Sequence, residues 1–297
     1  HVILCGPPGV GKTSAARLVL EEAKKLPQSP FAADAPFVEV DGNTLRFDPR
    51  DITNPLIGSV HDPIYQGASR NFADTGIPEP KLGLVSEAHG GMLFIDEIGE
   101  MDPLLLNKLL KVLEDKRVNF ESSYYDETDP LVPKYIKQLF EQGAPADFVL
   151  VGATTRAPEE INPAIRSRCA ELFFEPLFPE DIASIVRGSA EKLQIAYEEG
   201  VPELISRFTI EGRKANGLLA DAYGLALLRG EPLQIRKEDI YEMVRVSRLS
   251  PNPQLKDMGK MQIGRVFGLG VAGFVGSVIE IEAAAFPLGQ KEKKQTG

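Results

Sequence analysis

The chain has 297 residues, of which 43% are hydrophobic and 26% are charged, and its formal net charge is −10. This length allows about two domains with sizeable cores. The acidic balance argues against a protein whose whole surface grips nucleic acid, although it leaves room for a local basic patch. We therefore expect nucleic acid to be at most a secondary partner.

Cysteine content and apolar runs bear on the compartment. Only two cysteines are present, Cys5 and Cys169, which is too few for a disulfide framework and favours a reducing, cytoplasmic environment. No signal peptide or membrane segment is expected. The longest apolar run, residues 266–279, is short and glycine-rich, and we interpret it as buried strand. His1 stands where a methionine would be expected, which indicates a fragment of a longer protein.

Short apolar runs alternate with helical patterns over residues 1–175. This alternation predicts an α/β domain, with a parallel sheet and flanking helices. One expected helix, residues 104–116, has Asp102 as its N-cap and Pro103 at its first position. The expected strands are residues 2–5, 37–40, 92–95, 148–151 and 172–174, and a further helix is expected over residues 11–25.

After residue 175 the pattern changes. Residues 176–250 read as helices throughout, which predicts a second, small all-helical domain. Residues 251–262 open with a proline-rich turn and are expected to be a linker. Residues 263–297 are expected to begin a further domain with a short β segment. The helices are expected at residues 180–192, 202–208, 212–228 and 237–245.

A glycine-rich segment follows the first strand and fits the pattern G-x-x-x-x-G-K-[ST]. Glycines let successive backbone N–H groups point at phosphate oxygens, and the following helix directs its positive end toward them. Lys12 is expected to reach the β- and γ-phosphates, and the Thr13 hydroxyl to bind Mg²⁺. The expected nucleotide-binding residues are Gly6, Pro7, Pro8, Gly9, Val10, Gly11, Lys12, Thr13 and Ser14.

A second motif, G-G-M-L-F-I-D-E-I at residues 90–98, places two carboxylates at the end of an apolar strand. An acid at the end of a strand beside a phosphate loop can hold Mg²⁺, and the next carboxylate can deprotonate an attacking water. Asp96 is therefore assigned to the metal and Glu97 to the general base. The alternative is a strand that simply ends in solvated acids.

These two motifs, together with the strand F-V-L-V-G-A-T-T-R at residues 148–156, resemble an AAA+ ATPase. The resemblance implies a P-loop AAA+ fold with a helical lid domain, and ATP or ADP with Mg²⁺ as cofactors. It also implies a polar residue that senses the γ-phosphate at the end of the strand lying between the two motif strands. Thr155 is the best match, and Thr154 is the alternative.

The same resemblance assigns three arginines. The run N-P-A-I-R-S-R-C, residues 162–169, is similar to the arginine-finger region of AAA+ proteins, with Arg168 as first choice and Arg166 as runner-up. A finger acts on the nucleotide of the neighbouring subunit. Arg213 matches the second sensor, which reaches the phosphates from the lid. The alternative for Arg166 and Arg168 is a surface or intrasubunit salt bridge, and the alternative for Arg213 is an ordinary arginine on a helix surface.

Further segments narrow the resemblance to the ATPase module of a Lon protease, in the LonB-like branch. Residues 263–285 are similar to the opening strands of the Lon protease domain. The resemblance implies an ATP-dependent serine endopeptidase whose homohexameric ring pulls unfolded protein through a central pore. The serine–lysine dyad of that family is expected beyond Gly297, so no residue here is assigned to peptide cleavage. The other matching segments are residues 54–68, 81–98, 123–156 and 211–223.

Aromatic residues of a pore loop would grip the substrate backbone. Tyr65 is the candidate for the first loop, with Tyr124 and Tyr125 for a second; packing within their own domain is the alternative. The spacing of His61 and His89 fits no zinc site, and no metal is expected on either.

Two rival functions remain. One is a DNA-directed AAA+ motor of the branch-migration or clamp-loader type, since the G-A-T-T-R strand also occurs there. The other is an AAA+ activator of a sigma factor, because residues 64–68 vaguely resemble its polymerase-contacting loop. The C-terminal strands argue against both.

Overall fold

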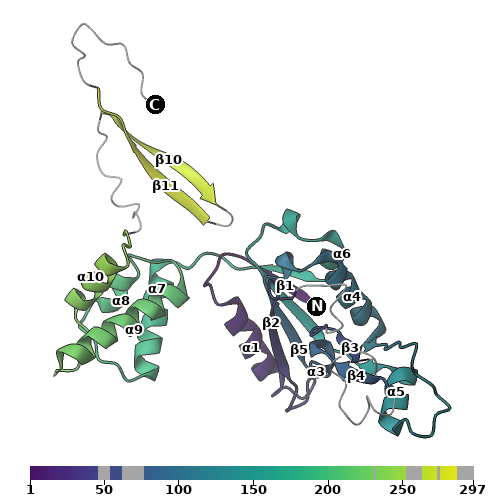
Figure 1. Ribbon diagram of the computed structural model, residues 1–297. Helices are drawn as coiled ribbons and strands as arrows, with labels where there is room; N and C mark the ends of the chain where they lie inside the picture. The colour runs from purple at the N-terminus through teal and green to yellow at the C-terminus, as the bar shows by residue number, and fades with distance from the viewer. Residues whose placement is uncertain (46–53, 62–76, 231, 252–262, 273–274, 286–297) are drawn as a thin grey trace. The chain divides into compact units, whose positions relative to one another are not determined.

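The computed structural model describes residues 1–45, 54–61, 77–230, 232–251, 263–272 and 275–285. The chain divides into two compact units, His1–Glu175 and Pro176–Gly297 (Figure 1). The first unit is an α/β structure, and the second contains a helical bundle and an antiparallel β-hairpin. The expected fold class, a parallel sheet with flanking helices followed by a helical part and a C-terminal β segment, is confirmed.

The first unit is built on a five-stranded parallel sheet with the strand order β2-β5-β8-β1-β9. Its central strands are almost continuously apolar and buried, as parallel strands covered on both faces must be. The order places β8 between β5 and β1, so the carboxyl ends of these three strands meet at one edge. The strands are β1 (Val2–Cys5), β2 (Phe37–Asp41), β5 (Met92–Asp96), β8 (Val149–Thr154) and β9 (Ala170–Phe173).

Helices cover both faces of this sheet. Helix α1 (Lys12–Ala23) packs on one face, where Ala16 and Leu20 meet Phe94 and Val151 in a buried cluster. Helix α4 (Pro103–Asp115) lies on the opposite face (Figure 1). The Asp102 side chain caps α4 as expected, because it accepts hydrogen bonds from the backbone N–H groups of Leu104 and Leu105 at 2.8 and 3.3 Å.

Several short elements of this unit have no counterpart in the sequence prediction. A small antiparallel pair, β3 (Gly58–His61) with β4 (Glu79–Leu82), is followed by helix α3 (Leu84–Glu87). A second pair joins β6 (Arg117–Val118) to β7 (Ala144–Pro145), with helix α5 (Lys134–Gln142) between them in sequence. Each strand is only two to four residues long, too short for a clear alternation of apolar and polar residues.

In the second unit, amphipathic helices pack around a common core that includes Ile182, Val186, Leu219 and Ile240. These helices agree with the expected ones to within a few residues at each end. They are α7 (Pro179–Lys192), α8 (Val201–Ile205), α9 (Gly212–Arg229) and α10 (Lys237–Val246).

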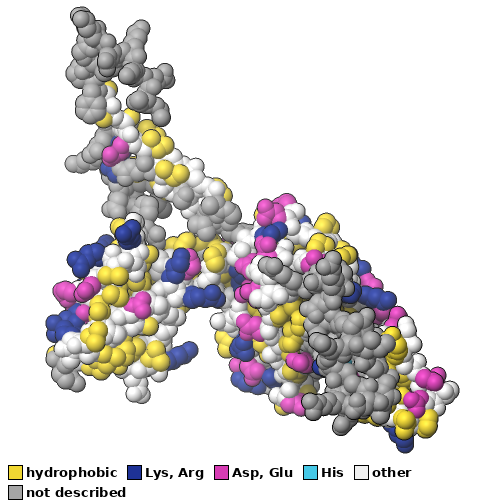
Figure 2. Space-filling model, in the orientation of Figure 1, with side chains coloured by type: hydrophobic (Ala, Val, Ile, Leu, Met, Phe, Trp, Pro, Cys, Tyr) yellow, Lys and Arg dark blue, Asp and Glu magenta, His cyan; other side chains and the backbone are white. Residues whose placement is uncertain are grey.

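The C-terminal β segment is a hairpin of β10 (Arg265–Ala272) and β11 (Val275–Glu282). The interpretation of residues 266–279 as buried strand is wrong in two respects: the run forms two strands, and most of its described apolar side chains are exposed in this chain. Leu269 is 87% exposed and Val271 82%, and hydrophobic side chains show along the visible face of the hairpin (Figure 2). An isolated two-stranded hairpin has no second layer against which to bury them.

Candidate active site

The candidate site lies where β1, β5 and β8 end. The glycine-rich segment leaves β1 and enters α1 at Lys12, with Gly11 as the N-cap. Gly6 donates its backbone N–H to the Thr154 carbonyl at 3.2 Å, which ties the start of the loop to the end of β8. A Cβ at Gly6 would lie 2.5 Å from the Phe174 carbonyl oxygen, so this position has no room for a side chain.

Lys12 is folded back over its own loop. Its side-chain Nζ donates to the carbonyl oxygens of Gly6 and Pro7, each at 2.8 Å, and the residue is 7% exposed. Burial lowers the pKa of Lys12, while the nearby Glu97 and Asp96 carboxylates oppose that shift. The ammonium group is therefore buried inside the loop, within electrostatic reach of the Asp96 and Glu97 carboxylates.

Asp96 is the last residue of β5, in register with Asp41 at the end of β2. Its Oδ1 accepts the backbone N–H of Glu97 at 3.1 Å. Thr13 follows Lys12 in the first turn of α1. Thr13 and Asp96 thus lie at the same edge of the sheet, and hydroxyl and carboxylate oxygens are ligands of the kind that Mg²⁺ prefers. The donor set fits the metal expected there.

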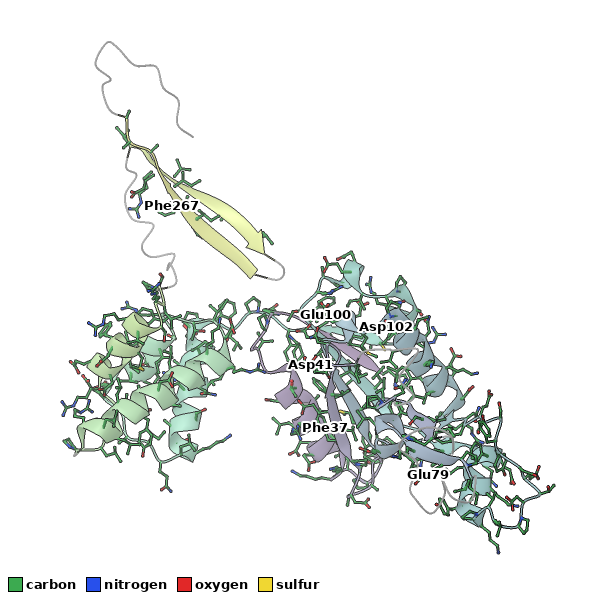
Figure 3. All side chains as sticks on the ribbon, in the orientation of Figure 1. Phe37, Asp41, Glu79, Glu100, Asp102 and Phe267 are labelled. Atoms are coloured by element: carbon green, nitrogen blue, oxygen red, sulfur yellow. The ribbon has the colours of Figure 1, made fainter. Side chains whose placement is uncertain are left out.

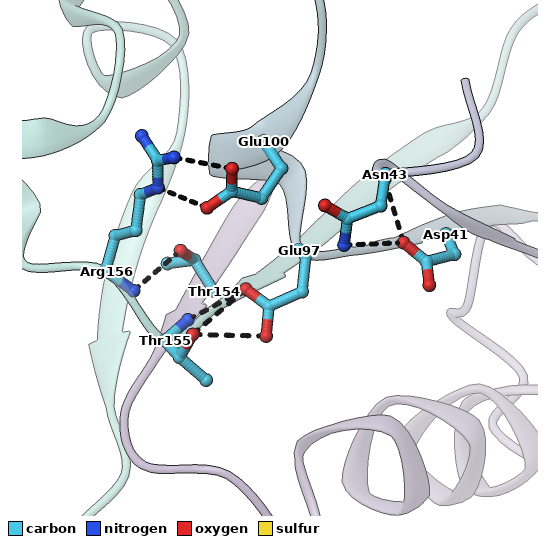
Figure 4. Close-up of polar contacts among 7 residues, drawn as sticks. All are labelled: Asp41, Asn43, Glu97, Glu100, Thr154, Thr155 and Arg156. Atoms are coloured by element: carbon cyan, nitrogen blue, oxygen red, sulfur yellow. Dashed lines mark hydrogen bonds and ion pairs between the residues drawn. The ribbon is translucent and has the colours of Figure 1, made fainter. Parts of the chain in front are cut away.

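Glu97 begins the turn after β5 with left-handed backbone angles, φ 48° and ψ 48°. Its carboxylate is held by Thr155 at the end of β8. Oε2 accepts the backbone N–H of Thr155 at 3.2 Å, and the Thr155 hydroxyl lies 3.1 and 3.2 Å from the two carboxylate oxygens (Figure 4). The structure thus brings together the expected general base and the expected sensor, although 58 residues separate them in sequence.

Thr154 lies differently. It is fully buried, and its hydroxyl accepts the backbone N–H of Arg156 at 3.0 Å. Thr155, by contrast, directs its hydroxyl to Glu97 and is partly exposed. Of the two threonines, Thr155 is the one whose hydroxyl contacts the Glu97 carboxylate.

Sequence reasoning missed Arg156 and Glu100. The Arg156 guanidinium forms two parallel contacts, from Nε and Nη2, to the two carboxylate oxygens of Glu100 (Figure 4). Glu100 ends the 3-10 turn η1 (Ile98–Glu100), next to the helix cap Asp102 (Figure 3). Arg156 directly follows the assigned Thr155, and Glu100 comes three positions after the assigned Glu97. This closeness in sequence was the available signal.

The two arginine-finger candidates have different partners. Arg166, in the short helix α6 (Pro163–Arg166), pairs with Glu171 of β9 through Nε at 2.6 Å and Nη2 at 3.2 Å. Glu171 raises the pKa of Arg166 through this hydrogen bond. Arg168 pairs with Glu114 of α4 and also donates to the Ala164 carbonyl at 2.9 Å. The Glu171 side chain is 20% exposed and the Glu114 side chain 57%, so Arg168 has the more open partner.

The remaining candidates belong to other parts of the chain. Arg213 is exposed in the first turn of α9, in the second unit. Tyr65 lies outside the described residues. Tyr125 stacks on Phe140 with ring centroids 4.2 Å apart, which supports packing within its own domain, whereas Tyr124 is 47% exposed.

Among the described residues, no group of three or more His, Cys, Asp and Glu side chains is arranged to hold a metal ion. Cys5 and Cys169 are both free thiols. Over the same residues, none of the helices has the length and apolar character needed to cross a membrane.

A phosphate loop after β1, an acid pair after β5 and a polar residue at the end of the strand between them define a nucleotide-binding P-loop ATPase. The chain matches the ATPase family associated with various cellular activities (AAA) over residues 2–177, and it belongs to that family.

Similarity to individual proteins is more specific. The chain is 50% identical over 285 residues to Lon protease 2 of Bacillus subtilis, covering 96% of this chain and 51% of the relative. It is 28% identical to the archaeal Lon protease of Methanothermobacter thermautotrophicus, covering 87% of this chain and 43% of the relative. The resemblance to the ATPase module of a Lon protease is thereby confirmed, and the chain spans about half the length of these relatives.

Among solved structures, the Holliday junction branch migration motor RuvB of Thermotoga maritima has a TM-score of 0.51 at 21% identity. The match covers 83% of this chain and 61% of that one. At this identity the likeness concerns the fold.

Proposed function

We propose that this chain is the ATP-hydrolysing motor module of an ATP-dependent Lon-type serine endopeptidase, which unfolds and translocates protein substrates. The observation that carries the proposal is the 50% identity to a Lon protease over 96% of the chain. This similarity runs past residue 177, where the match to the AAA family ends.

Each part of the site has a role in this proposal. The loop residues 6–14 bind the phosphates, with Lys12 releasing its bonds to the loop carbonyls in favour of the nucleotide. Mg²⁺, held by Thr13 and Asp96, would neutralise the phosphate charge. Glu97 takes the proton of the attacking water, and Thr155, which already contacts Glu97, senses the γ-phosphate. The buried hydroxyl of Thr154, bonded to backbone, supports Thr155 over Thr154.

The roles of the arginines depend on assembly. We assign the finger to Arg168, because Arg166 is committed to a two-bond pair with the less exposed Glu171. Arg213 would contact the phosphates from the helical lid, and a ring of six copies would bring Arg168 to the neighbour's nucleotide. Tyr65 stays the candidate for gripping the substrate.

The domain assignment is part of the same proposal. Residues 1–175 form the ATPase core, 176–250 the lid, 251–262 a linker and 263–297 the start of a protease domain. The hairpin β10–β11 supports the last assignment, since both of its faces carry exposed apolar side chains that a complete domain would cover. Alternation of side chains places Leu269 and Val271 on one face and Val266 and Ile281 on the other.

The test is steady-state Mg-ATPase activity of the chain alone, with an unfolded protein such as casein, and with duplex DNA. Stimulation by casein and not by DNA is expected. Stimulation by DNA alone would instead support a DNA-directed motor, and absence of turnover would contradict the assignment of ATP hydrolysis to this chain. The Glu97→Gln variant is the control for contaminating ATPase.

A further inference from the structure

The turn after β5 holds its first residue in an unfavourable conformation. Glu97 is one of few non-glycine residues with positive φ among those described, and η1 follows it directly. A left-handed conformation at a residue with a Cβ persists only where its surroundings enforce it. The contacts that fix both ends of this turn therefore decide where the Glu97 carboxylate lies.

On the upstream side, the sheet provides the constraint. Asp96 is paired in register with Asp41, and the Asp96 carbonyl accepts the backbone N–H of Gly42 at 2.7 Å. Downstream, Ile98 is 3% exposed and packs against Gly152 in the middle of β8, where a Cβ would come within 2.8 Å of it.

The second downstream constraint is the pair of Glu100 with Arg156. It is bidentate, it joins positions 56 apart in sequence, and both side chains are partly shielded, at 33% and 39% exposed. Gly99 lies beneath it: a Cβ there would be 3.1 Å from Arg156 Cδ and 3.1 Å from the Thr154 hydroxyl. Two-bond pairs of this geometry hold direction as well as distance.

The segments that this pair joins are the ones that carry the reacting groups. Glu97 precedes Glu100 by one turn, and Thr155 directly precedes Arg156 (Figure 4). Two sets of polar contacts therefore link the turn at η1 to the end of β8: Glu97 with Thr155, and Glu100 with Arg156.

We propose that Glu100 and Arg156 are a positioning pair, which locks the turn after β5 onto the end of β8 so that Glu97 faces Thr155. This inference rests on the proposed role of Glu97 as the general base. Neither Glu100 nor Arg156 needs to touch the nucleotide; the pair acts through the backbone of the two segments. The pKa of Arg156 is raised, first by its hydrogen bond to Glu100 and then by the charges of Glu100, Glu160 and Glu97, so its guanidinium stays charged at all working pH values.

A double-mutant cycle tests the pair. Glu100→Gln and Arg156→Gln are compared with the double variant and with the parent chain. We expect each single variant to lower kcat about tenfold with KM changed less than twofold, and the double variant to lose no more than either one. Asp147→Asn, which breaks the more exposed pair with Lys116 in the same unit, is the matched control and should leave kcat unchanged.

Two outcomes would overturn the inference. A loss with Arg156→Gln but not with Glu100→Gln would mean that the guanidinium acts elsewhere, for example on a neighbour's nucleotide. Additive losses in the double variant would mean that the two residues act independently.

Hydrogen exchange without nucleotide provides a readout that does not depend on turnover. Amides of residues 97–101 and 154–157 should exchange faster in both single variants than in the parent, and those of α1 should not. Unchanged exchange would overturn the positioning role. If the parent chain fails to hydrolyse ATP while the two variants still show faster exchange than the parent, the result would count against the proposed function but support the positioning pair.

Discussion

Lys12 is the residue on which, in our proposal, nucleotide affinity depends most directly. Its ammonium group is buried among loop carbonyls, within electrostatic reach of Asp96 and Glu97, so a bound phosphate gains a charge that is already in place. Lys12→Ala should abolish binding of a fluorescent ADP analogue, measured by titration. Lys25→Ala, beyond the end of α1 in an exposed pair with Glu22, is the control and should bind normally. Unchanged affinity in Lys12→Ala would remove Lys12 from the site.

Glu97 is predicted to serve hydrolysis and not binding. Glu97→Gln keeps the size of the side chain and one acceptor for Thr155, but it removes the base. ATP binding should persist while steady-state turnover falls by about 10²–10⁴-fold. Turnover near the parent rate would refute the assignment. Nucleotide binding is measured by the same titration as for Lys12→Ala. The Lys12 variant thus tests nucleotide affinity, and the Glu97 variant tests the hydrolysis step.

At the scale of elements, helix α4 depends on its cap. Asp102 satisfies two backbone N–H groups at the start of α4, and Pro103 follows at the first helical position. Asp102→Ala should lower the free energy of unfolding by about 1 kcal/mol. The measurement is the midpoint of urea unfolding of the chain without nucleotide. Asp102→Asn retains a capping oxygen and should stay close to the parent; an equal loss in both variants would contradict capping as the cause.

The elements also show where sequence patterns suffice. The strands of the parallel sheet and the long helices are predicted because each carries an apolar run or a repeated apolar stripe, as in β5 and α4. The pairs β3–β4 and β6–β7 are not predicted, since they are defined by pairing between distant residues. For β10–β11 the apolar run itself misleads, because exposure depends on what packs against it.

At the scale of the whole molecule, the prediction concerns assembly. If Arg168 is a finger, Arg168→Ala should leave nucleotide affinity intact and cut turnover on the order of 10³-fold or more. The defect should appear in trans: Arg168→Ala subunits mixed with Lys12→Ala subunits should regain activity at interfaces that pair an intact finger with an intact loop. Arg166→Ala is the comparison. Any loss of turnover in Arg166→Ala should be accompanied by a loss of stability, because the pair of Arg166 with Glu171 ties α6 to β9 within the subunit.

Absence of any recovery in the mixtures would contradict a finger at Arg168. Recovery with Arg166→Ala in its place would move the finger to Arg166. Size-exclusion chromatography of each mixture verifies that the two kinds of subunit assemble together.

The amino-acid sequence by itself determined the family and predicted the chemistry, because the phosphate loop and the acid pair are local patterns whose spacing follows directly from strand, turn and helix geometry. It ranked Thr155 above Thr154 and Arg168 above Arg166 without showing what any of them contacts, and it left Arg156 unnoticed. Only the tertiary structure decided their partners: it places Glu97 on Thr155, Glu100 on Arg156 and Glu171 on Arg166. The physical reason is that hydrogen bonds and ion pairs join groups by distance in space, and the order β5-β8-β1, which sets those distances, appears in no local stretch of the chain.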